Sequence, residues 1–538
     1  MPTDCISYPE TNYFTPLILD YLSEKKELRE FYNRFPKIEN FGDHIAEKKK
    51  SYDHSIRKDL LDVLQHQYSK LAVSEKTKNN IESLASENTF TVVTGHQLNL
   101  FTGPLYFLYK IISTINLTKQ LKEKYPNNNF VPVYWMATED HDFEEINFFN
   151  LHGKKFKWNS PDKRAGQTAV GTLSTEGLEE VFKLFSAEIG GGENADFLKS
   201  LFEKAYLQHD NLTDATRFIA NELFTEHGLV IIAAGDKRLK KHFITYVENE
   251  LIRQISHKQT TSTVEKINSL GYNIQVNPRE INLFYLNDEM RERIIEREGK
   301  FFVHETNISW SKEEILQELK EHPERFSPNV MLRPLYQEVI LPNLCYIGGG
   351  GELAYWLELE SYFKAEEVTF PMLLLRNSAL LQTEKQKEKR EKLNISISEL
   401  FLKQHELINR KVRKISNIDI NFSPQKEHLI TQFQQMYDLA EQTDESFLGA
   451  VKAQEVKQLK GLDNLEKRLL KAQKRKLKDE VERIATLQNE LFPHRSLQER
   501  QTNFSEFYND YGNKLINKLM AELDPLESNF KILTFGKE

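Results

Sequence analysis

The stretch "TVVTGHQLNLFTGPLY", residues 91–106, joins the end of one apolar run to the start of another. β-Branched residues lead into Thr94, Gly95, His96 and Gln97, and an apolar helical pattern follows. A glycine directly after a buried strand allows a tight turn and a close approach of the backbone to a ligand. The stretch therefore predicts a strand-to-helix junction of an α/β protein, where such proteins place their ligands.

Five segments, this one included, are short, continuously apolar and rich in β-branched or aromatic residues, as buried parallel strands are. They are residues 89–94, 131–137, 229–234, 345–348 and 369–375. Helical patterns separate them, most clearly at residues 104–124, 236–257 and 352–364. This alternation predicts an α/β fold with a doubly wound parallel sheet.

The spacing of the strands predicts how the chain is divided. The intervals after the second and third strands exceed a single crossover helix, so we expect subdomains inserted at about 150–228 and 258–330. The glycine-containing stretch 184–197 is predicted to be a flexible loop, and "SKEE" at 311–314 a capping box that opens a helix. The core then spans residues 1–382.

The segment 383–495 is predicted to be a coiled-coil arm. Its composition becomes strongly charged, and proline is absent between residues 425 and 491. A coiled-coil spacing is formed by Leu477, Val481, Ile484 and Leu491, with Gln488 between the last two. We expect residues 384–414 to pair with 425–491 in an antiparallel arm that mediates a homodimer. The remaining segment, 496–538, is expected to dock back on the core.

Composition excludes several classes of protein. The chain has 538 residues, a net charge of −8 and two cysteines, which excludes a disulfide framework and any multi-thiolate zinc site. The N-terminus does not resemble a signal peptide, and no apolar run is long enough to span a membrane. We expect a soluble cytoplasmic protein that binds neither membrane nor nucleic acid. The basic stretch 466–483 leaves nucleic-acid binding as an alternative to a solvated helix face.

A second polar stretch, "TEDHDFEEIN" (138–147), follows the second predicted strand. Glu139, Asp140, His141 and Asp142 stand together there, and mutual repulsion would raise the pKa of their carboxyl groups unless a cation compensates. The cluster could recognise an amine, act as a general base, supply a pair of metal ligands, or only begin a helix. Its spacing matches no metal motif, so no metal ligand is predicted.

A third stretch, "CYIGGGGELAYWLELE" (345–360), places a run of glycines between a strand and a helix. Such a backbone presents little obstruction to a flat ligand. We expect a nucleotide or substrate to contact this run, while Glu352 accepts hydrogen bonds from hydroxyl groups and Cys345 stays an inert buried thiol. The residues of the run are Gly348, Gly349, Gly350 and Gly351.

Two arginines are further candidates. Arg376 and Asn377 follow the last predicted strand, where an arginine can neutralise phosphate charge, and Arg333 precedes the fourth strand. An arginine alone is more often a surface or ion-pair residue. Tyr355 lies in the helix after the glycine run, where it could pack or bind substrate.

Taken in order, these stretches resemble the bacillithiol biosynthesis cysteine-adding enzymes, the BshC family of cysteine ligases. The resemblance rests on "VVTGHQLNLFTGPLY", "VPVYWMATEDHDFEEIN", "SPNVMLRPLYQEVILPN", "YIGGGGELAYWLELE", "RNSALL" and "LFPHRSLQERQTNF". It implies a Rossmann-like core with connecting-peptide inserts, a C-terminal coiled coil and a homodimer. The implied reaction adds cysteine to glucosaminyl-malate, the last step of bacillithiol synthesis.

The core is also similar to class I aminoacyl-tRNA synthetases, with Gly95-His96-Gln97 and Arg376-Asn377-Ser378 at the two phosphate-binding places. This implies ATP, with Mg²⁺, as the activator of the cysteine carboxyl group. Catalysis is then expected from His96, Asp140, His141 and Asp142. Cofactor binding is expected from Thr94, Gly95, Gln97, Gly348 to Gly351, Glu352, Arg376 and Asn377, and substrate binding from Glu139, Arg333 and Tyr355. The alternative is a nucleotide-binding scaffold without ligase activity.

Overall fold

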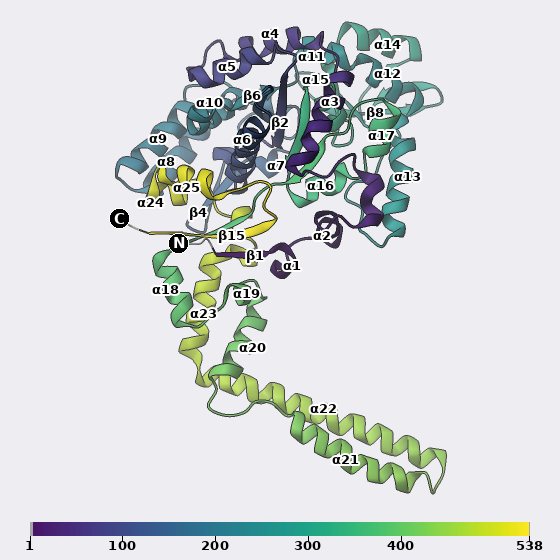
Figure 1. Cartoon of the computed structure of the whole chain (residues 1–538), viewed down its shortest axis with the longest axis vertical. Coiled ribbons are helices and arrows are strands. Elements are labelled where there is room, and N and C mark those ends of the chain that lie inside the picture. Colours follow the sequence, from purple (N-terminus) through teal and green to yellow (C-terminus); the bar gives the residue numbers. More distant parts are fainter. Residues whose placement is uncertain (1–3, 537–538) are drawn as a thin grey trace.

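The computed structural model describes residues 4–536, and a five-stranded parallel sheet lies at the centre of the core (Figure 1). All of its neighbouring strands pair in parallel. Their order across the sheet is β13 (Met372–Leu375), β12 (Asn343–Gly348), β2 (Thr89–His96), β3 (Asn129–Met136) and β6 (Val230–Ala233). Each of the five predicted strands lies in this sheet, and β2, the first of them, is central. The predicted doubly wound α/β fold is confirmed.

Helices cover both faces of this sheet. On one face, α3 (Phe41–Ser51) and α6 (Tyr106–Lys124) share an apolar cluster with alternate strand residues such as Ile347. On the other face, Tyr346 stacks on Trp356 of α16 (Gly350–Trp356) at 4.6 Å between ring centroids. Because neighbouring strand residues point to opposite faces, both faces are apolar, as the continuous runs in the sequence predicted.

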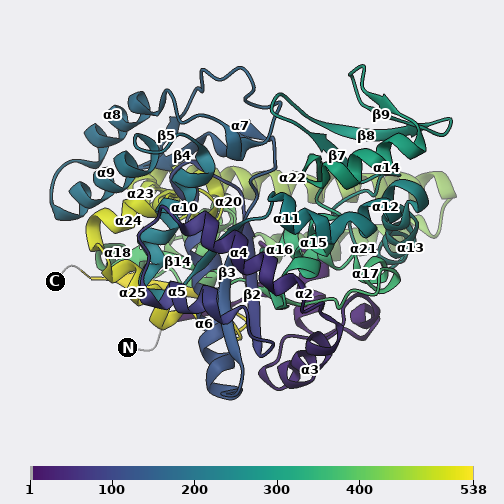
Figure 2. The ribbon, with the colours of Figure 1, turned by 90° about the horizontal axis from the view of Figure 1, so that it is seen from above.

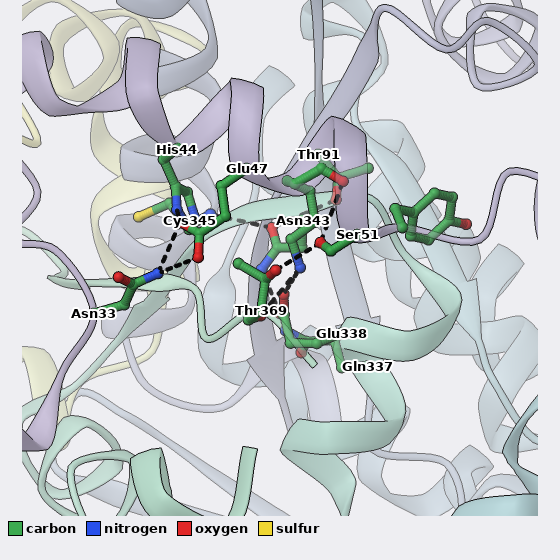
Figure 3. A network of polar contacts seen from close by, with 12 residues as sticks. Asn33, His44, Glu47, Ser51, Thr91, Gln337, Glu338, Asn343, Cys345 and Thr369 are labelled. Carbon is green, nitrogen blue, oxygen red and sulfur yellow. Dashed lines mark hydrogen bonds and ion pairs between the residues drawn. The ribbon is translucent and has the colours of Figure 1, made fainter. Parts of the chain in front are cut away.

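A buried polar network fixes α3 at the amino end of β12 (Figure 3). Lys48 of α3 forms a 2.9 Å ion pair with Glu338 of α15 (Arg333–Ile340), and Asn343 donates to the same carboxylate at 2.6 Å. Cys345 is completely buried beside this network, and burial raises the pKa of its thiol well above the ordinary value. The structure thus agrees with an inert, packed cysteine.

The first insert lies between β3 and β6. A β-hairpin, β4 (Phe148–Leu151) and β5 (Lys154–Lys157), precedes the helices α8 (Leu178–Ile189), α9 (Glu193–Tyr206) and α10 (Leu212–Phe224). The prediction of a flexible loop at 184–197 is wrong, because α8 and α9 occupy most of it. Only Gly190–Gly192 form the turn, with φ of 78° at Gly190 and 115° at Gly192, where a side chain would be strained.

The second insert contains an antiparallel sheet that the sequence did not predict. Its order is β10 (Ser309–Trp310), β9 (Lys300–Val303), β8 (Arg291–Arg297), β7 (Leu283–Leu286) and β11 (Phe326–Pro328). The predicted capping box is confirmed: Ser311 and Glu314 cap α14 (Lys312–Glu321) reciprocally. Figure 2 shows the two inserts side by side above the strands of the core.

The arm projects from the core as a helical hairpin, seen at the bottom of Figure 1. Helix α21 (Ser423–Ala440) packs against α22 (Glu445–Lys476), and Asp444 caps α22 through the backbone N–H of Phe447 at 3.0 Å. Residues 425–491 therefore fold back on themselves, and the predicted pairing of 384–414 with 425–491 is found only for α23 (Lys478–Leu491) and part of α22. Helix α20 (Gln404–Ile415) packs against α23 and part of α22.

The predicted seam is satisfied within the chain. Ile484 and Leu491 are buried, and Gln488 donates to the backbone carbonyls of Leu400 and Leu402 at 3.0 and 2.8 Å. The C-terminal strand β15 (Asn529–Phe535) lies between β1 (Asp4–Ser7) and β14 (Ala379–Thr383). Among the helices of residues 4–536, none has the length and apolar content needed to cross a membrane.

Candidate active site

A cavity of about 800 Å³ opens at the carboxyl ends of β12, β2 and β3. The strand order reverses between β2 and β12, which is the switch point where doubly wound sheets bind ligands. Most residues predicted from the sequence line this cavity: Gly95, His96, Gln97, Glu139, Asp140, His141, Asp142, Arg333, Gly349, Gly351, Glu352, Tyr355 and Arg376.

Four predicted cofactor-binding residues do not line the cavity. Thr94 donates to the carbonyl of Ile347 at 2.7 Å, and Asn377 donates to the carbonyl of Asp524 at 2.7 Å. A Cβ on Gly348 would come within 2.9 Å of the side chains of Leu353 and Tyr346, so this glycine serves close packing. Gly350 faces the N-terminal helix residue Ile18. These four residues stabilise the ends of the strands. The cavity is lined by adjacent residues such as Gly95, Gly349 and Arg376.

Lys110 is a site residue that the sequence analysis missed. It lies on α6, is almost completely buried, and reaches the carboxylate of Glu352 at 2.6 Å and the carbonyl of Gly95 at 2.6 Å. Glu352 also accepts from the backbone N–H of Gly349 and the hydroxyl of Tyr346. Burial would raise the pKa of Glu352, but the Lys110 ammonium, together with the Gly349 N–H and the Tyr346 hydroxyl, holds that pKa below its ordinary value.

Arg376 and Arg333 line the cavity together with Lys110. The Nη atoms of Arg376 donate to the Asn377 carbonyl, the Ser378 hydroxyl and the Glu499 carboxylate. Its Nε is buried and has no hydrogen-bond partner within residues 4–536. This Nε lies 3.8 Å from the place of a Cβ on Gly349, so it is a donor beside the glycine run. Arg333 donates to the Tyr355 hydroxyl at 3.1 Å, and both line the cavity.

His96 lines the cavity as a neutral side chain. It is 6% exposed and packs against Tyr106 and Phe107. Burial, aided by the charge of Lys110, lowers the pKa of His96 to about 3. At neutral pH the ring is therefore uncharged, so any hydrogen bond that His96 donates to a ligand comes from a neutral imidazole.

The acidic stretch after β3 lies on the other side of the cavity. Asp140 accepts from the Gln97 side chain at 2.5 Å and from the backbone N–H of His141 at 2.8 Å. Arg291, from the second insert, donates to Nδ1 of His141 at 2.7 Å. Nδ1 is therefore the acceptor nitrogen of a neutral ring, and the Arg291 guanidinium already occupies it. His141 and Asp140 are thus held in place by protein groups.

Asp142 and Glu145 are the carboxylates most available to a ligand. Asp142 is exposed at the cavity, and its carboxylate has no hydrogen-bond or ion-pair partner in the part of the chain that the structure describes. Glu145 also lines the cavity; burial, then the charges of Asp142 and Asp140, raise its pKa. The expected rise in carboxyl pKa from neighbouring negative charges therefore occurs at Glu145, which was not among the predicted site residues. Glu145 belongs to the same polar stretch, 138–147, so its position in the sequence already indicated it.

The trio Asp140, His141 and Asp142 brings three possible metal-ligand atoms within 4.8 Å of one another. The guanidinium of Arg291 already occupies Nδ1 of His141 and adds a positive charge there. In this arrangement Nδ1 of His141 is therefore not free to bind a metal ion.

Glu139 is paired inside the protein. Both of its carboxylate oxygens lie near Nζ of the buried Lys240, at 2.8 and 3.0 Å. Burial lowers the pKa of Lys240, and Glu139 opposes that shift. The expected role of Glu139 in binding a substrate ammonium is not favoured by this arrangement, because Lys240 already balances its charge.

The cavity thus has two sides of opposite charge. The cations are Lys110 of α6, Arg333 of α15 and Arg376 after β13, and the stretch after β3 supplies carboxylates, with Gly95 and Gln97 between the two sides. Such a surface can hold a molecule that is anionic at one end and cationic at the other. Together with the doubly wound sheet, its inserts and its helical arm, this site defines an enzyme of the Rossmann-like α/β class.

Comparison with known proteins gives the family. Residues 1–377 match the domain described as "Bacillithiol biosynthesis BshC, N-terminal Rossmann-like domain", and residues 379–535 match "Bacillithiol biosynthesis BshC, C-terminal coiled-coil domain". The chain belongs to the BshC family, as the motifs indicated, and is an enzyme of the ligase class.

Relatives over the full length support this assignment. Proteins named "Putative cysteine ligase BshC" are 83% identical in Christiangramia forsetii, over 100% of both chains, and 61% identical in Flavobacterium johnsoniae, over 99% of this chain and 100% of the relative. The one from Cytophaga hutchinsonii is 38% identical over 98% of both. A Campylobacter jejuni structure titled as a putative arginyl tRNA synthetase is matched over 85% of this chain and 99% of its own, with 10% identity and a TM-score of 0.21.

Proposed function

We propose that this protein joins the carboxyl group of cysteine to the amine of glucosaminyl-malate after activating that carboxyl with ATP. Family membership supports the ligase chemistry, and the observation that carries the proposal is the pair of oppositely charged sides of the cavity. In the first step the cysteine carboxylate attacks the α-phosphate of ATP, which forms cysteinyl adenylate and releases pyrophosphate. In the second step the amine displaces AMP, and one proton leaves the nitrogen.

The cationic side fits the phosphate groups of ATP. The unpartnered Nε of Arg376 is a buried donor beside Gly349, and a charge-assisted hydrogen bond to phosphate suits it. Gly351 leaves space at the same place, since the nearest atom to an added Cβ would be 3.9 Å away. Mg²⁺ would accompany the nucleotide. In this proposal Glu352, oriented by Lys110, accepts from nucleoside or substrate hydroxyl groups.

The acidic side fits the attacking amine. An ammonium group is not nucleophilic, so a base must remove its proton near neutral pH. Asp142 is accessible for this, and the raised pKa of Glu145 makes that carboxyl a stronger base than an ordinary one. In this proposal Asp140, His141 and Arg291 hold the stretch in place and do not take the proton.

One reaction tests the proposal. The purified protein is incubated with ATP, cysteine and glucosaminyl-malate, and mass spectrometry is used to look for the amide product and AMP. Formation of both only when all three substrates are present is the expected result. Nucleotide binding without product would favour the alternative, a nucleotide-binding scaffold.

We further propose that the protein is a cytoplasmic homodimer joined through the distal hairpin of the arm. The proximal seam is already satisfied, but α21 and α22 leave large apolar side chains exposed: Ile430, Met436, Leu439, Phe447, Leu448, Val456 and Leu465. A second copy would cover them. Leu439→Glu with Val456→Glu should give a monomer by light scattering without loss of helicity, and an unchanged dimer mass would exclude this interface.

A further inference from the structure

A second cavity, of about 850 Å³, adjoins the candidate active site. The two cavities share Thr138, Glu139 and Gly235 as a common wall. The second one lies beyond the carboxyl ends of β3 and β6, and it is enclosed by α4 (Ile56–Tyr68), α10 and the two inserts. Both cavities therefore open along one edge of the sheet, next to each other.

At the common wall, residues 170–171 of the first insert pack closely against the segment after β3. Backbone N–H groups of Val170 and Gly171 donate to the carbonyls of Asp140 and Thr138, at 2.6 and 2.9 Å. A Cβ on Gly171 would lie 2.4 Å from the hydroxyl of Thr213 and 2.8 Å from Cβ of Thr138, so only glycine fits there. The first insert thus fixes the strand extension that separates the cavities.

The carboxylates around the second cavity are mostly paired within the protein. Asp214 pairs with Arg217 at 2.7 Å, and Asp236 pairs with Arg238 at 2.8 Å. Glu139 pairs with Lys240, as described above. Glu324 lies near Lys237 and His322, and Asp288 is the one lining carboxylate without an ion-pair partner among residues 4–536, so most of the negative charge is balanced before any ligand arrives.

Several donors in the same lining remain available. Lys70 has no hydrogen-bond or ion-pair partner among residues 4–536, and Nε of Arg217 is buried without a hydrogen-bond partner there. His209 uses Nδ1 on the carbonyls of Lys204 and Ala205, which leaves its Nε2. An excess of donors over unpaired carboxylates suits a ligand that carries carboxylate and hydroxyl groups.

We propose that the second cavity binds the acceptor substrate, an amino sugar that carries carboxylate groups, and that it presents the amine across the wall formed by Thr138 and Glu139. This inference rests on the proposed ligation, in which ATP and cysteine occupy the first cavity. The acidic part of the acceptor lies toward Lys70 and His209, and its amine lies toward the first cavity. Because the two cavities share Thr138, Glu139 and Gly235, an amine held in the second cavity lies next to the first. Both substrates can then be bound at the same time.

Two variants test the assignment, and a third is the control. Lys70→Met removes an exposed donor, and Thr172→Trp fills the cavity from an exposed position on its rim. Lys78→Met removes the same charge from an exposed position outside both cavities. Calorimetry measures the dissociation constants for glucosaminyl-malate and for ATP separately, and steady-state kinetics gives KM for each substrate.

We expect Lys70→Met to weaken acceptor binding about tenfold, and Thr172→Trp to abolish it. Neither should change ATP affinity or the KM for cysteine, and Lys78→Met should behave as the wild type. Product formation with unchanged acceptor affinity in both cavity variants would overturn this assignment and leave the ligase proposal standing. The wild type could instead bind the acceptor but make no product, while the variants bind the acceptor more weakly. That result would support the cavity assignment and overturn the ligase proposal. A wild type that binds no acceptor would overturn the cavity assignment.

Discussion

Arg376→Lys should separate ligand binding from folding, because the nitrogens of Arg376 have different partners. Both Nη atoms are engaged by protein acceptors, including Glu499, and Nε alone remains for a ligand. A lysine can keep its charge beside Glu499 but cannot supply a second donor at the glycine run. The substitution therefore removes one ligand contact and keeps the local charge.

The expected loss of ATP affinity corresponds to one lost donor, the Nε of Arg376. One charge-assisted hydrogen bond contributes about 1.5–3 kcal/mol, which is roughly a 10- to 150-fold increase in the Kd for ATP. The lost bonds to the Asn377 carbonyl and the Ser378 hydroxyl should also lower the free energy of unfolding by about 1–2 kcal/mol. The assay is calorimetric titration with ATP, combined with urea unfolding of the same samples.

Ser378→Ala is the matched control. It removes one acceptor of Arg376 but leaves Nε untouched, so it should lower stability slightly and leave ATP affinity unchanged. The reasoning would be refuted if folded Arg376→Lys bound ATP within about twofold of the wild type. An equal loss of affinity in Ser378→Ala would assign the effect to general loosening of the segment after β13.

Three further predictions concern other parts of the first cavity. Asp142→Asn should lower turnover about a hundredfold with ATP affinity unchanged; an equal loss of ATP affinity in the titration would contradict its role toward the amine. Gly351→Ala should weaken ATP binding at least about threefold and Gly350→Ala should not, since a Cβ at 350 meets Ile18 at 3.6 Å; equal titrations would place the ligand elsewhere. The lowered pKa of His96, about 3, favours the neutral ring, so its contribution to stability is complete above pH 6.5 and is lost as pH falls from there toward 3. His96→Gln should remove up to about 2 kcal/mol of the difference in unfolding free energy between pH 7 and pH 5, and an unchanged difference in urea unfolding would show that His96 is not buried neutral.

The central sheet could be predicted because each of its strands is buried on both faces. Segments such as 89–94 and 345–348 are then continuous apolar runs, a signal that needs no partner to be recognised. The antiparallel sheet of the second insert has no such signal. Its strand β8 reads "RERIIER", and neither strict alternation nor an apolar run marks it as a strand. Its pairing with β7 and β9 decides its conformation.

The same distinction explains the arm. The glycine-poor and proline-free segment 425–491 correctly indicated helices, but helix propensity does not say where a long helix turns back. The turn depends on the packing of α21 against α22 and on the cap that Asp444 supplies. The predicted pairing of 384–414 is confined to α23 and part of α22 for this reason, because the main partner of α22 is α21, the helix that precedes it.

The candidate site divides along similar lines. Residues at strand ends, such as Gln97 and Asp140, could be predicted to meet because parallel strands share one carboxyl edge. Arg291 and Lys240 reach the same edge from an insert and a crossover helix, and no local pattern marks them. Lys110 is different: a single lysine stands within the apolar stretch "YFLYKIISTINL" of α6, and a charge inside a buried helix requires a partner. Glu352 and the Gly95 carbonyl are those partners, so the charge that looks misplaced in the helix orients the carboxylate that closes the glycine run.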